Sequence, residues 1–211
     1  MTPSPYASAR REVKDACVRL ADRGFLAATG GNVSLRAAPR LFAVTPSGLD
    51  YYAMSAEDVC VLRIDTLEVV FGGLRPSVES GLHAAVLRSR PDAAAVVHTH
   101  QPLASAVALL HREVPVVDEA ARRVLGEAIE PVGYAPSGTA LLVRALRRRL
   151  RAGVNAYALR NHGLVCCGAS MDEALLAVEL AERAAASYLR EAIGRNGGDG
   201  DLVSFALAAL P

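Results

Sequence analysis

Apolar residues recur at helical spacing near the start of the chain. Val13, Cys17 and Leu20 would share one face of a helix, and Gly24 follows as a residue that commonly ends one. Three later segments have similar periodicity, and a fourth begins at a Ser-x-x-Glu capping box formed by residues 170–173. The predicted helices cover residues 9–25, 77–90, 103–110, 138–151 and 170–188.

Short runs rich in β-branched residues lie between these helices, and each run is bounded by Gly, Ser, Thr or Pro, as strands commonly are. Residues 59–65 and 67–73 are typical of a hairpin, and residues 156–168 of one strand bent at residues 161–163. The predicted strands cover residues 29–36, 41–52, 59–65, 67–73, 93–100 and 156–168, with a short strand or turn at residues 114–119.

The alternation of helices with short strands of mixed direction predicts an α/β fold. We expect one layered domain over residues 1–211, with a central, mostly antiparallel sheet flanked by helices. Within this domain, residues 194–211 are expected to form a flexible break and a short apolar C-terminal tail.

The composition supports a globular protein, because 52% of the 211 residues are hydrophobic and 21% are charged. Much of the apolar content is alanine, and no stretch reaches the roughly 18 uninterrupted apolar residues that a membrane span needs. The first residues carry charges where a secretory signal would have an apolar run. We therefore expect a cytoplasmic protein with no membrane partner.

Charge and cysteine usage exclude two further classes. The chain has 23 Lys and Arg against 22 Asp and Glu, and a net charge of +1 offers no basic excess to hold a nucleic acid. The cysteines lack Cys-x-x-Cys spacing, which argues against a structural zinc knuckle and favours free thiols. These cysteines are Cys17, Cys60, Cys166 and Cys167.

Two of the five histidines stand two residues apart in a predicted strand. Side chains at positions i and i+2 of a strand point to the same face, so His98 and His100 would project side by side, as a metal clamp requires. His162, in the bend of another predicted strand, is the candidate third ligand. The alternative interpretation is a set of hydrogen-bonded core histidines.

The other two histidines are weaker candidates. His83 follows Glu79 by four residues on a predicted helix, so both side chains would share one face, and His83 could support a site indirectly or simply face a groove. His111 lies in a polar turn, where a solvated role is expected.

The order of five segments resembles the class II aldolase and adducin family. These segments are TGGNVSLR, TPSGLDYYAMSAEDVCVL, RPSVESGLH, VVHTH and NHGLVCCG, and the resemblance runs from about residue 8 to about residue 189. The pattern is similar to that of fuculose-phosphate and rhamnulose-phosphate aldolases and ribulose-phosphate epimerases. The resemblance implies a zinc-type ion held by His98, His100 and His162, with Mn²⁺ or Co²⁺ as other suitable ions.

The resemblance also implies roles for residues around that ion. Glu79 would lie against the metal, as a possible further ligand, and transfer the proton. Backbone groups and hydroxyls of three loops would bind the substrate or its phosphate, because glycines let backbone N–H groups approach an anion. These binding residues are Gly31, Asn32, Ser47, Gly48 and Ser77.

Two departures from the family pattern bear on the substrate and on the reaction. Val78 stands where sugar-phosphate aldolases with a PSSE segment have a second serine, so we expect weaker phosphate binding or a different substrate end. Asp118 and Glu119 stand about where fuculose-type aldolases use a tyrosine from a neighbouring subunit as proton donor. These acids are candidate proton donors or helix caps, and Tyr134 is another candidate donor.

The resemblance predicts an aldehyde-lyase that makes or breaks a carbon–carbon bond in a small hydroxylated carbonyl compound, a sugar phosphate, through a metal-stabilised enediolate. The alternatives are a decarboxylase, dehydratase or epimerase on a related sugar acid or ketose. A non-catalytic adducin-like module would be expected to lose histidines that this chain retains. By analogy with relatives, we expect a homotetramer with sites between subunits.

Overall fold

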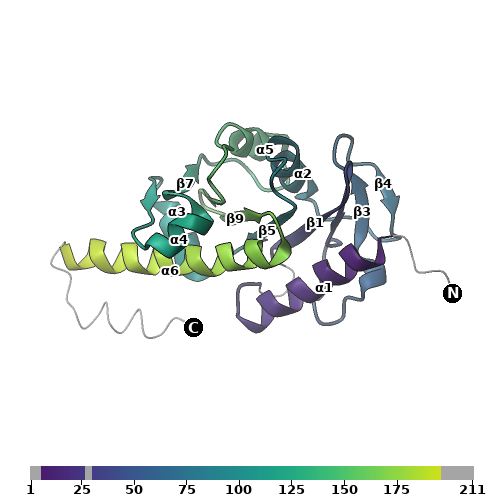
Figure 1. Cartoon of the computed structure of the whole chain (residues 1–211), viewed down its shortest axis with the longest axis horizontal. Helices are drawn as coiled ribbons and strands as arrows, with labels where there is room; N and C mark the ends of the chain where they lie inside the picture. The colour runs from purple at the N-terminus through teal and green to yellow at the C-terminus, as the bar shows by residue number, and fades with distance from the viewer. Residues whose placement is uncertain (1–5, 27–29, 196–211) are drawn as a thin grey trace.

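The computed structural model describes residues 6–26 and 30–195, and in this part of the chain six α-helices surround one sheet (Figure 1). The helices are α1 (Ala7–Asp22), α2 (Ser80–Ser89), α3 (Pro102–Leu109), α4 (Glu119–Leu125), α5 (Ala140–Arg147) and α6 (Met171–Arg195), with the 3-10 turn η1 (Ala56–Asp58). The strands are β1 (Asn32–Ala38), β2 (Leu41–Val44), β3 (Cys60–Arg63), β4 (Val69–Phe71), β5 (Ala95–Thr99), β6 (Val114–Pro115), β7 (Ala128–Val132), β8 (Ala156–Leu159) and β9 (Gly163–Gly168).

The nine strands form one sheet in the order β4-β3-β2-β1-β5-β9-β8-β7-β6. Strands β7 and β8 run parallel, and the other neighbouring pairs are antiparallel. Strand β5 lies between β1 and β9, with Asn32 opposite His98 and Thr99 opposite Leu164. The predicted α/β fold with a mostly antiparallel central sheet is therefore confirmed.

Helices cover both faces of the sheet, and each face has its own hydrophobic core. Helices α1, α3, α4 and α6 pack on one face, and α2 and α5 pack on the other (Figure 1). Strand β5 contributes to both cores, because Ala95 and Val97 belong to the first cluster and Val96 to the second. This central strand is buried on both faces, as its continuous apolar run predicts.

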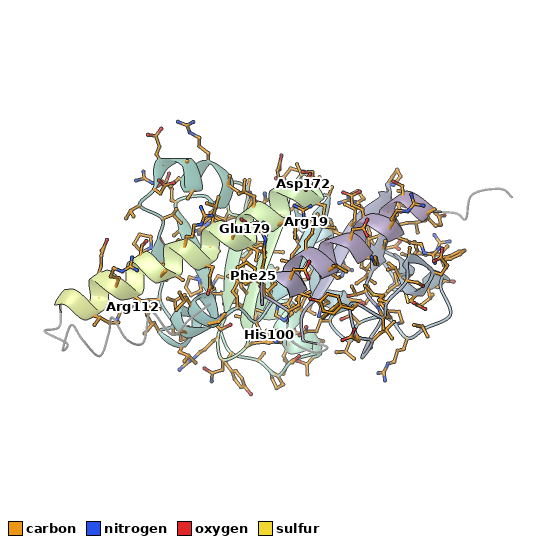
Figure 2. All side chains as sticks on the ribbon, turned by 90° about the horizontal axis from the view of Figure 1, so that it is seen from below. Arg19, Phe25, His100, Arg112, Asp172 and Glu179 are labelled. Carbon is orange, nitrogen blue, oxygen red and sulfur yellow. The ribbon has the colours of Figure 1, made fainter. Side chains whose placement is uncertain are left out.

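Ion pairs join the first and last helices on the surface of the molecule. Arg19 of α1 lies 2.8 Å from Asp172 of α6, and Arg23 pairs with Glu179 (Figure 2). Arg19 and Asp172 are largely exposed and Glu179 is partly buried, and such surface pairs contribute little to stability, about 0–1 kcal/mol each. The apolar contacts beneath them therefore carry most of the packing between α1 and α6.

One strand prediction is wrong in its topology. Residues 156–168 form two antiparallel strands, β8 and β9, rather than one bent strand. The chain reverses between Leu159 and Gly163, and Asn161 adopts a positive φ of 55° in this turn. Asn is among the non-glycine residues that tolerate this conformation, so the sequence does contain a turn signal at that point.

The structure adds two elements that the apolar pattern does not predict, helix α4 and strand β7. Glu130 and Pro131 interrupt the apolar run of β7. The buried Glu130 carboxylate pairs with Arg149 and Arg151 at 3.2 and 2.5 Å. Pro131 lies beyond the stretch that pairs with β6, so its missing N–H leaves no gap in that ladder.

Helix α6 is longer than predicted, because it continues past Tyr188 and includes Gly194 and Arg195. The rest of the predicted break and tail, residues 196–211, lies outside the described residues. In the part of the chain that the structure describes, no helix is both long enough and apolar enough to cross a membrane.

Candidate metal centre

His98 and His100 lie at the end of the central strand β5. His98 is within the strand and completely buried, whereas His100 follows it and is exposed. Their Nε2 atoms are 2.9 Å apart, so the two side chains do project side by side, as the strand periodicity predicts. His100 is labelled in Figure 2. This pair of histidines therefore has one buried and one solvent-accessible member.

His162 reaches the same place from the turn between β8 and β9. Its Nε2 atom lies 3.2 Å from Nε2 of His98. Gly163 makes this approach possible, because a Cβ there would lie 2.3 Å from Thr99 O and 2.7 Å from Cδ2 of His100. The pairing of β9 with β5 thus brings together residues that are far apart in the sequence.

The three histidines form a donor set that fits a metal ion, because one ligand atom from each lies within 4.8 Å of the others. Nδ1 of His98 is 2.8 Å from the carbonyl oxygen of Leu164. A carbonyl only accepts, so Nδ1 carries the proton and the Nε2 lone pair faces His100 and His162. A cation between these nitrogens would satisfy the converging lone pairs. Nδ1 of His162 is buried with no hydrogen-bond partner among the described residues.

Burial also favours the protonation state that binds metal. Burial lowers the pKa of His98 to about 3, and the partial desolvation of the His100 ring beside it lowers the pKa of His100 as well. Both imidazoles are therefore neutral at neutral pH, which is the form in which histidine is a metal ligand.

Glu79 lies against the histidines from the other side. It occupies the N-cap position of α2, with Oε2 3.3 Å from Nε2 of His98 and Oε1 3.3 Å from Nε2 of His162. Asn32 donates to Oε2 at 2.9 Å, and the Ser137 hydroxyl donates to Oε1 at 2.8 Å. Each carboxylate oxygen therefore has one protein donor and one histidine neighbour.

The environment of Glu79 favours its charged form. Burial raises the pKa of the Glu79 carboxyl, but the hydrogen bonds from Asn32 and Ser137 stabilise the carboxylate and hold the pKa below its ordinary value. Sequence reasoning missed Ser137, which precedes Gly138 and the start of α5. Its only sequence signal is the position of a hydroxyl in the Pro-Ser-Gly loop before a helix.

His83 is completely buried behind this carboxylate, on α2. Its Nε2 forms a short hydrogen bond with Oδ1 of Asn32, and its Nδ1 lies 2.7 Å from the hydroxyl of Ser34. The indirect connection of His83 to the site runs through Asn32. His111 is exposed in a surface turn with a φ of 54°.

The predicted binding loops lie beside one another. Gly31 has a φ of 90°, and a Cβ there would lie 2.7 Å from the carbonyl oxygen of His98, so its backbone packs directly on the strand that carries the histidines. The loops that precede Ser47 and Ser77 are joined by an isolated bridge between Pro46 and Pro76. Gly48 has a φ of 74° and open space around it.

Two of these candidate residues already have hydrogen-bond partners within the protein. The side-chain amide of Asn32 uses its nitrogen on Glu79 and its oxygen on His83. The hydroxyl of Ser77 accepts from the backbone N–H of Glu79 at 3.2 Å. Both side chains therefore take part in the hydrogen bonds around Glu79.

The residues at which the sequence departs from the family pattern lie at the surface. Val78 is 55% exposed, and Tyr134 is also exposed. Asp118 caps α4 by accepting from the Ala121 N–H at 2.7 Å, and Glu119 pairs with Arg123 at 2.6 Å. Asp118 therefore acts as the helix cap that was its alternative role.

Comparisons with known proteins identify the family. The sequence pattern of the class II aldolase and adducin N-terminal domain matches residues 11–189. The chain belongs to the class II aldolase and adducin family. L-Fuculose phosphate aldolase of Escherichia coli K12 is 32% identical over 179 residues, which cover 85% of this chain and 81% of the relative. 5-Deoxy-D-ribulose 1-phosphate aldolase of Bacillus thuringiensis is 33% identical over 180 residues, covering 85% and 83%.

Solved structures agree with this assignment. An L-fuculose 1-phosphate aldolase matches with a TM-score of 0.79 and 28% identity, covering 91% of this chain and 88% of that one. YgbL of Escherichia coli, described as a candidate aldolase, epimerase or decarboxylase, matches with a TM-score of 0.79 and 26% identity, covering 88% and 90%. The chain is therefore a lyase of the class II aldolase type.

Proposed function

We propose that this class II aldolase is a divalent-metal-dependent enzyme that makes or breaks a carbon–carbon bond in a small hydroxylated carbonyl compound, a sugar phosphate, through an enediolate. One observation carries the proposal: the buried carboxylate of Glu79 has one oxygen 3.3 Å from Nε2 of His98 and the other 3.3 Å from Nε2 of His162. The aldolase names of the curated relatives support the same reaction class.

The ion would be held by His98, His100 and His162, with Glu79 as a possible further ligand. Zn²⁺ suits three imidazoles best, and Mn²⁺ or Co²⁺ would also fit. When bound, a divalent ion polarises a carbonyl and offsets the negative charge that develops on the oxygens of an enediolate. Because His100 is exposed, a substrate can reach the cluster from solvent.

Glu79 would move the proton. Its carboxylate is ionised at neutral pH, which is the form that accepts a proton from a substrate hydroxyl or carbon. Asn32 and Ser137 hold its two oxygens in place, so little reorganisation is needed when the proton is transferred.

The three loops around Gly31, Ser47 and Ser77 would bind the far end of the substrate through backbone N–H groups and hydroxyls. Val78 supplies no hydroxyl here, so we expect a smaller preference for phosphorylated substrates than a second serine would give. A preference of several orders of magnitude for the phosphorylated compound would contradict this expectation.

Epimerisation or decarboxylation of a related sugar acid or ketose is the second candidate function. The similarity to YgbL favours keeping this candidate, because that protein is described with those reactions. Both reactions would use the same histidines and Glu79, so the assays below must include them.

We also propose a cytoplasmic homotetramer with sites between subunits, in which Asp118 or Glu119 of one copy would supply an acid to the site of its neighbour. Gel filtration and cross-linking at micromolar concentration are expected to give a tetramer. An active monomer would overturn this part of the proposal.

The decisive experiment combines metal analysis with aldol, decarboxylation and epimerisation assays. We expect His100→Ala to lose bound metal and activity together. Glu79→Gln is expected to lower kcat by about 10²- to 10⁴-fold, as loss of a proton-transfer group does. His111→Asn, which changes a surface histidine at a positive φ that Asn tolerates, is the matched control. Full metal content and activity in His100→Ala would overturn the proposal.

A further inference from the structure

Four buried polar side chains form a chain of hydrogen bonds that ends at Glu79, beside the three clustered histidines. Asn32 and Ser34 are two residues apart on strand β1, so they share one face. Glu79 and His83 are four residues apart at the start of α2, so they also share one face. The two elements pack with these faces together, and the contacts alternate from Ser34 to His83, Asn32 and finally Glu79.

We propose that His83, as a neutral imidazole protonated at Nε2, is a positioning residue that fixes the side-chain amide of Asn32 and, through it, the carboxylate of Glu79. The consequence for the reaction rests on the proposed function of Glu79. The proton on Nε2 itself follows from the hydrogen bonds.

The direction of the Asn32 amide is the first step. A carboxylate only accepts hydrogen bonds, so the amide nitrogen must face Oε2 of Glu79, at 2.9 Å. The amide oxygen then faces Nε2 of His83. An amide oxygen also only accepts, so Nε2 must carry a proton.

The other ring nitrogen completes the pattern. His83 has no exposed surface, and burial lowers its pKa to about 4, so the ring is neutral at neutral pH and Nδ1 keeps a lone pair. The Ser34 hydroxyl, 2.7 Å away, can donate to that lone pair. The backbone of Val96 also interacts with the ring, and the alternative neutral form carries its proton on Nδ1. That form would set the Nε2 lone pair against the amide oxygen of Asn32.

This arrangement prevents Asn32 from turning over. A flipped amide would place its oxygen against the Glu79 carboxylate and its N–H₂ group against the N–H of His83, so both hydrogen bonds would become repulsive. With His83 in place, Oε2 of Glu79 keeps a donor from β1 while Oε1 keeps one from Ser137. The carboxylate is therefore held toward His98 and His162 from two sides.

Nitrogen NMR of the histidine rings tests the protonation pattern without any assay of activity. In protein labelled with ¹⁵N-histidine at neutral pH, the resonances that disappear in His83→Leu belong to His83. We expect a protonated Nε2 and an unprotonated Nδ1 with a slowly exchanging ring proton. An Nδ1-protonated ring or a doubly protonated ring would overturn the inference.

Variants of His83 test the positioning role. The amide nitrogen of Gln can reach the position of Nε2, whereas that of Asn lies nearer Nδ1. We therefore expect His83→Gln to keep kcat within about 3-fold of the original enzyme, and His83→Asn and His83→Leu to lower kcat about 10- to 100-fold with KM little changed. L-Fuculose 1-phosphate and 5-deoxy-D-ribulose 1-phosphate are the probes. Equal kcat in Leu, Asn and Gln variants would overturn the positioning role.

Two controls separate this role from loss of stability and from failure of the proposed function. Leu146→Ala removes a buried side chain from helix α5, which packs into the same core as α2, and is expected to lower the melting temperature while leaving kcat unchanged. If the original enzyme cleaves neither probe, the proposed substrate class fails, and the NMR result still decides the protonation of His83.

Discussion

Gly163 determines how closely the three histidines can approach one another. A side chain there would meet the backbone oxygen of Thr99 and the ring of His100, and neither a strand carbonyl nor a clustered ring can move without disturbing the site. A hydrogen at this position is therefore as much a requirement of the proposed metal centre as the imidazoles.

We expect Gly163→Ala to weaken metal binding by at least about 10-fold and to lower kcat with it, because displacing a ligand ring changes the donor geometry. Gly133→Ala is the matched control, since a Cβ at Gly133 meets nothing within 4 Å. Metal titration of both apoproteins is the measurement. Unchanged metal affinity in Gly163→Ala would show that the cluster can rearrange at low cost.

At the residue scale, the sequence predicts the pair His98 and His100 because a strand period of two is a local property. It cannot predict that Ser137 reaches Glu79, because that contact depends on how α5 packs against α2. The same limit applies to Asn32, whose side chain is directed at Glu79 and His83 rather than only into a binding loop.

Arg90 connects the end of helix α2 to the segment before strand β8. Arg90 is 4% exposed, and its guanidinium donates to Asp92, to the backbone oxygens of Arg151 and Val154, and to the side-chain oxygen of Asn155. A planar group with five donors is needed to serve partners in several directions. Arg90 thus links the end of helix α2 to residues 151–155, which precede strand β8.

Replacing Arg90 by Met is expected to lower the free energy of unfolding by about 3 kcal/mol, because buried carbonyl oxygens lose charged donors. Arg147→Met, at an exposed position of α5, is expected to change it by less than about 0.5 kcal/mol. Urea denaturation of both variants makes the comparison. Equal stability of the two variants would contradict the proposed bracing role of Arg90.

At the element scale, helices with an apolar stripe and strands with β-branched runs are predictable, and α1, α2 and β5 follow that rule. Strand β7 does not, because Glu130 is buried only through its pairing with Arg149 and Arg151, which come from a later part of the chain. The turn between β8 and β9 is likewise predicted only as a bend, since Asn161 and Gly163 do not reveal by themselves which strands will pair.

At the scale of the whole molecule, the fold buries the cysteine thiols away from solvent. All four cysteines are free and buried. Burial raises the pKa of Cys17 and Cys166 far above the ordinary thiol value, and it raises the pKa of Cys167 to about 11. Since the thiolate is the reactive form, native cysteines should be unreactive at neutral pH.

We expect a colorimetric thiol reagent to find no fast-reacting thiol in the native protein and four after unfolding in guanidinium. Cys60, whose pKa is also raised by burial, should be the first to react as denaturant is added, because it lies near the edge of the sheet on β3. A thiol that reacts within seconds in the native state would contradict the observed burial.

The register of β1, β5 and β9 would couple binding of the proposed metal ion to folding of the chain. Asn32 lies opposite His98, and the pairing of β5 with β9 brings His162 to them, so an unfolded chain has no preformed site. By mass action, a free ion at 100 times its dissociation constant would stabilise the folded state by about 2.7 kcal/mol. The melting temperature should therefore rise with ion concentration and fall with a chelator, and His100→Ala should abolish both responses.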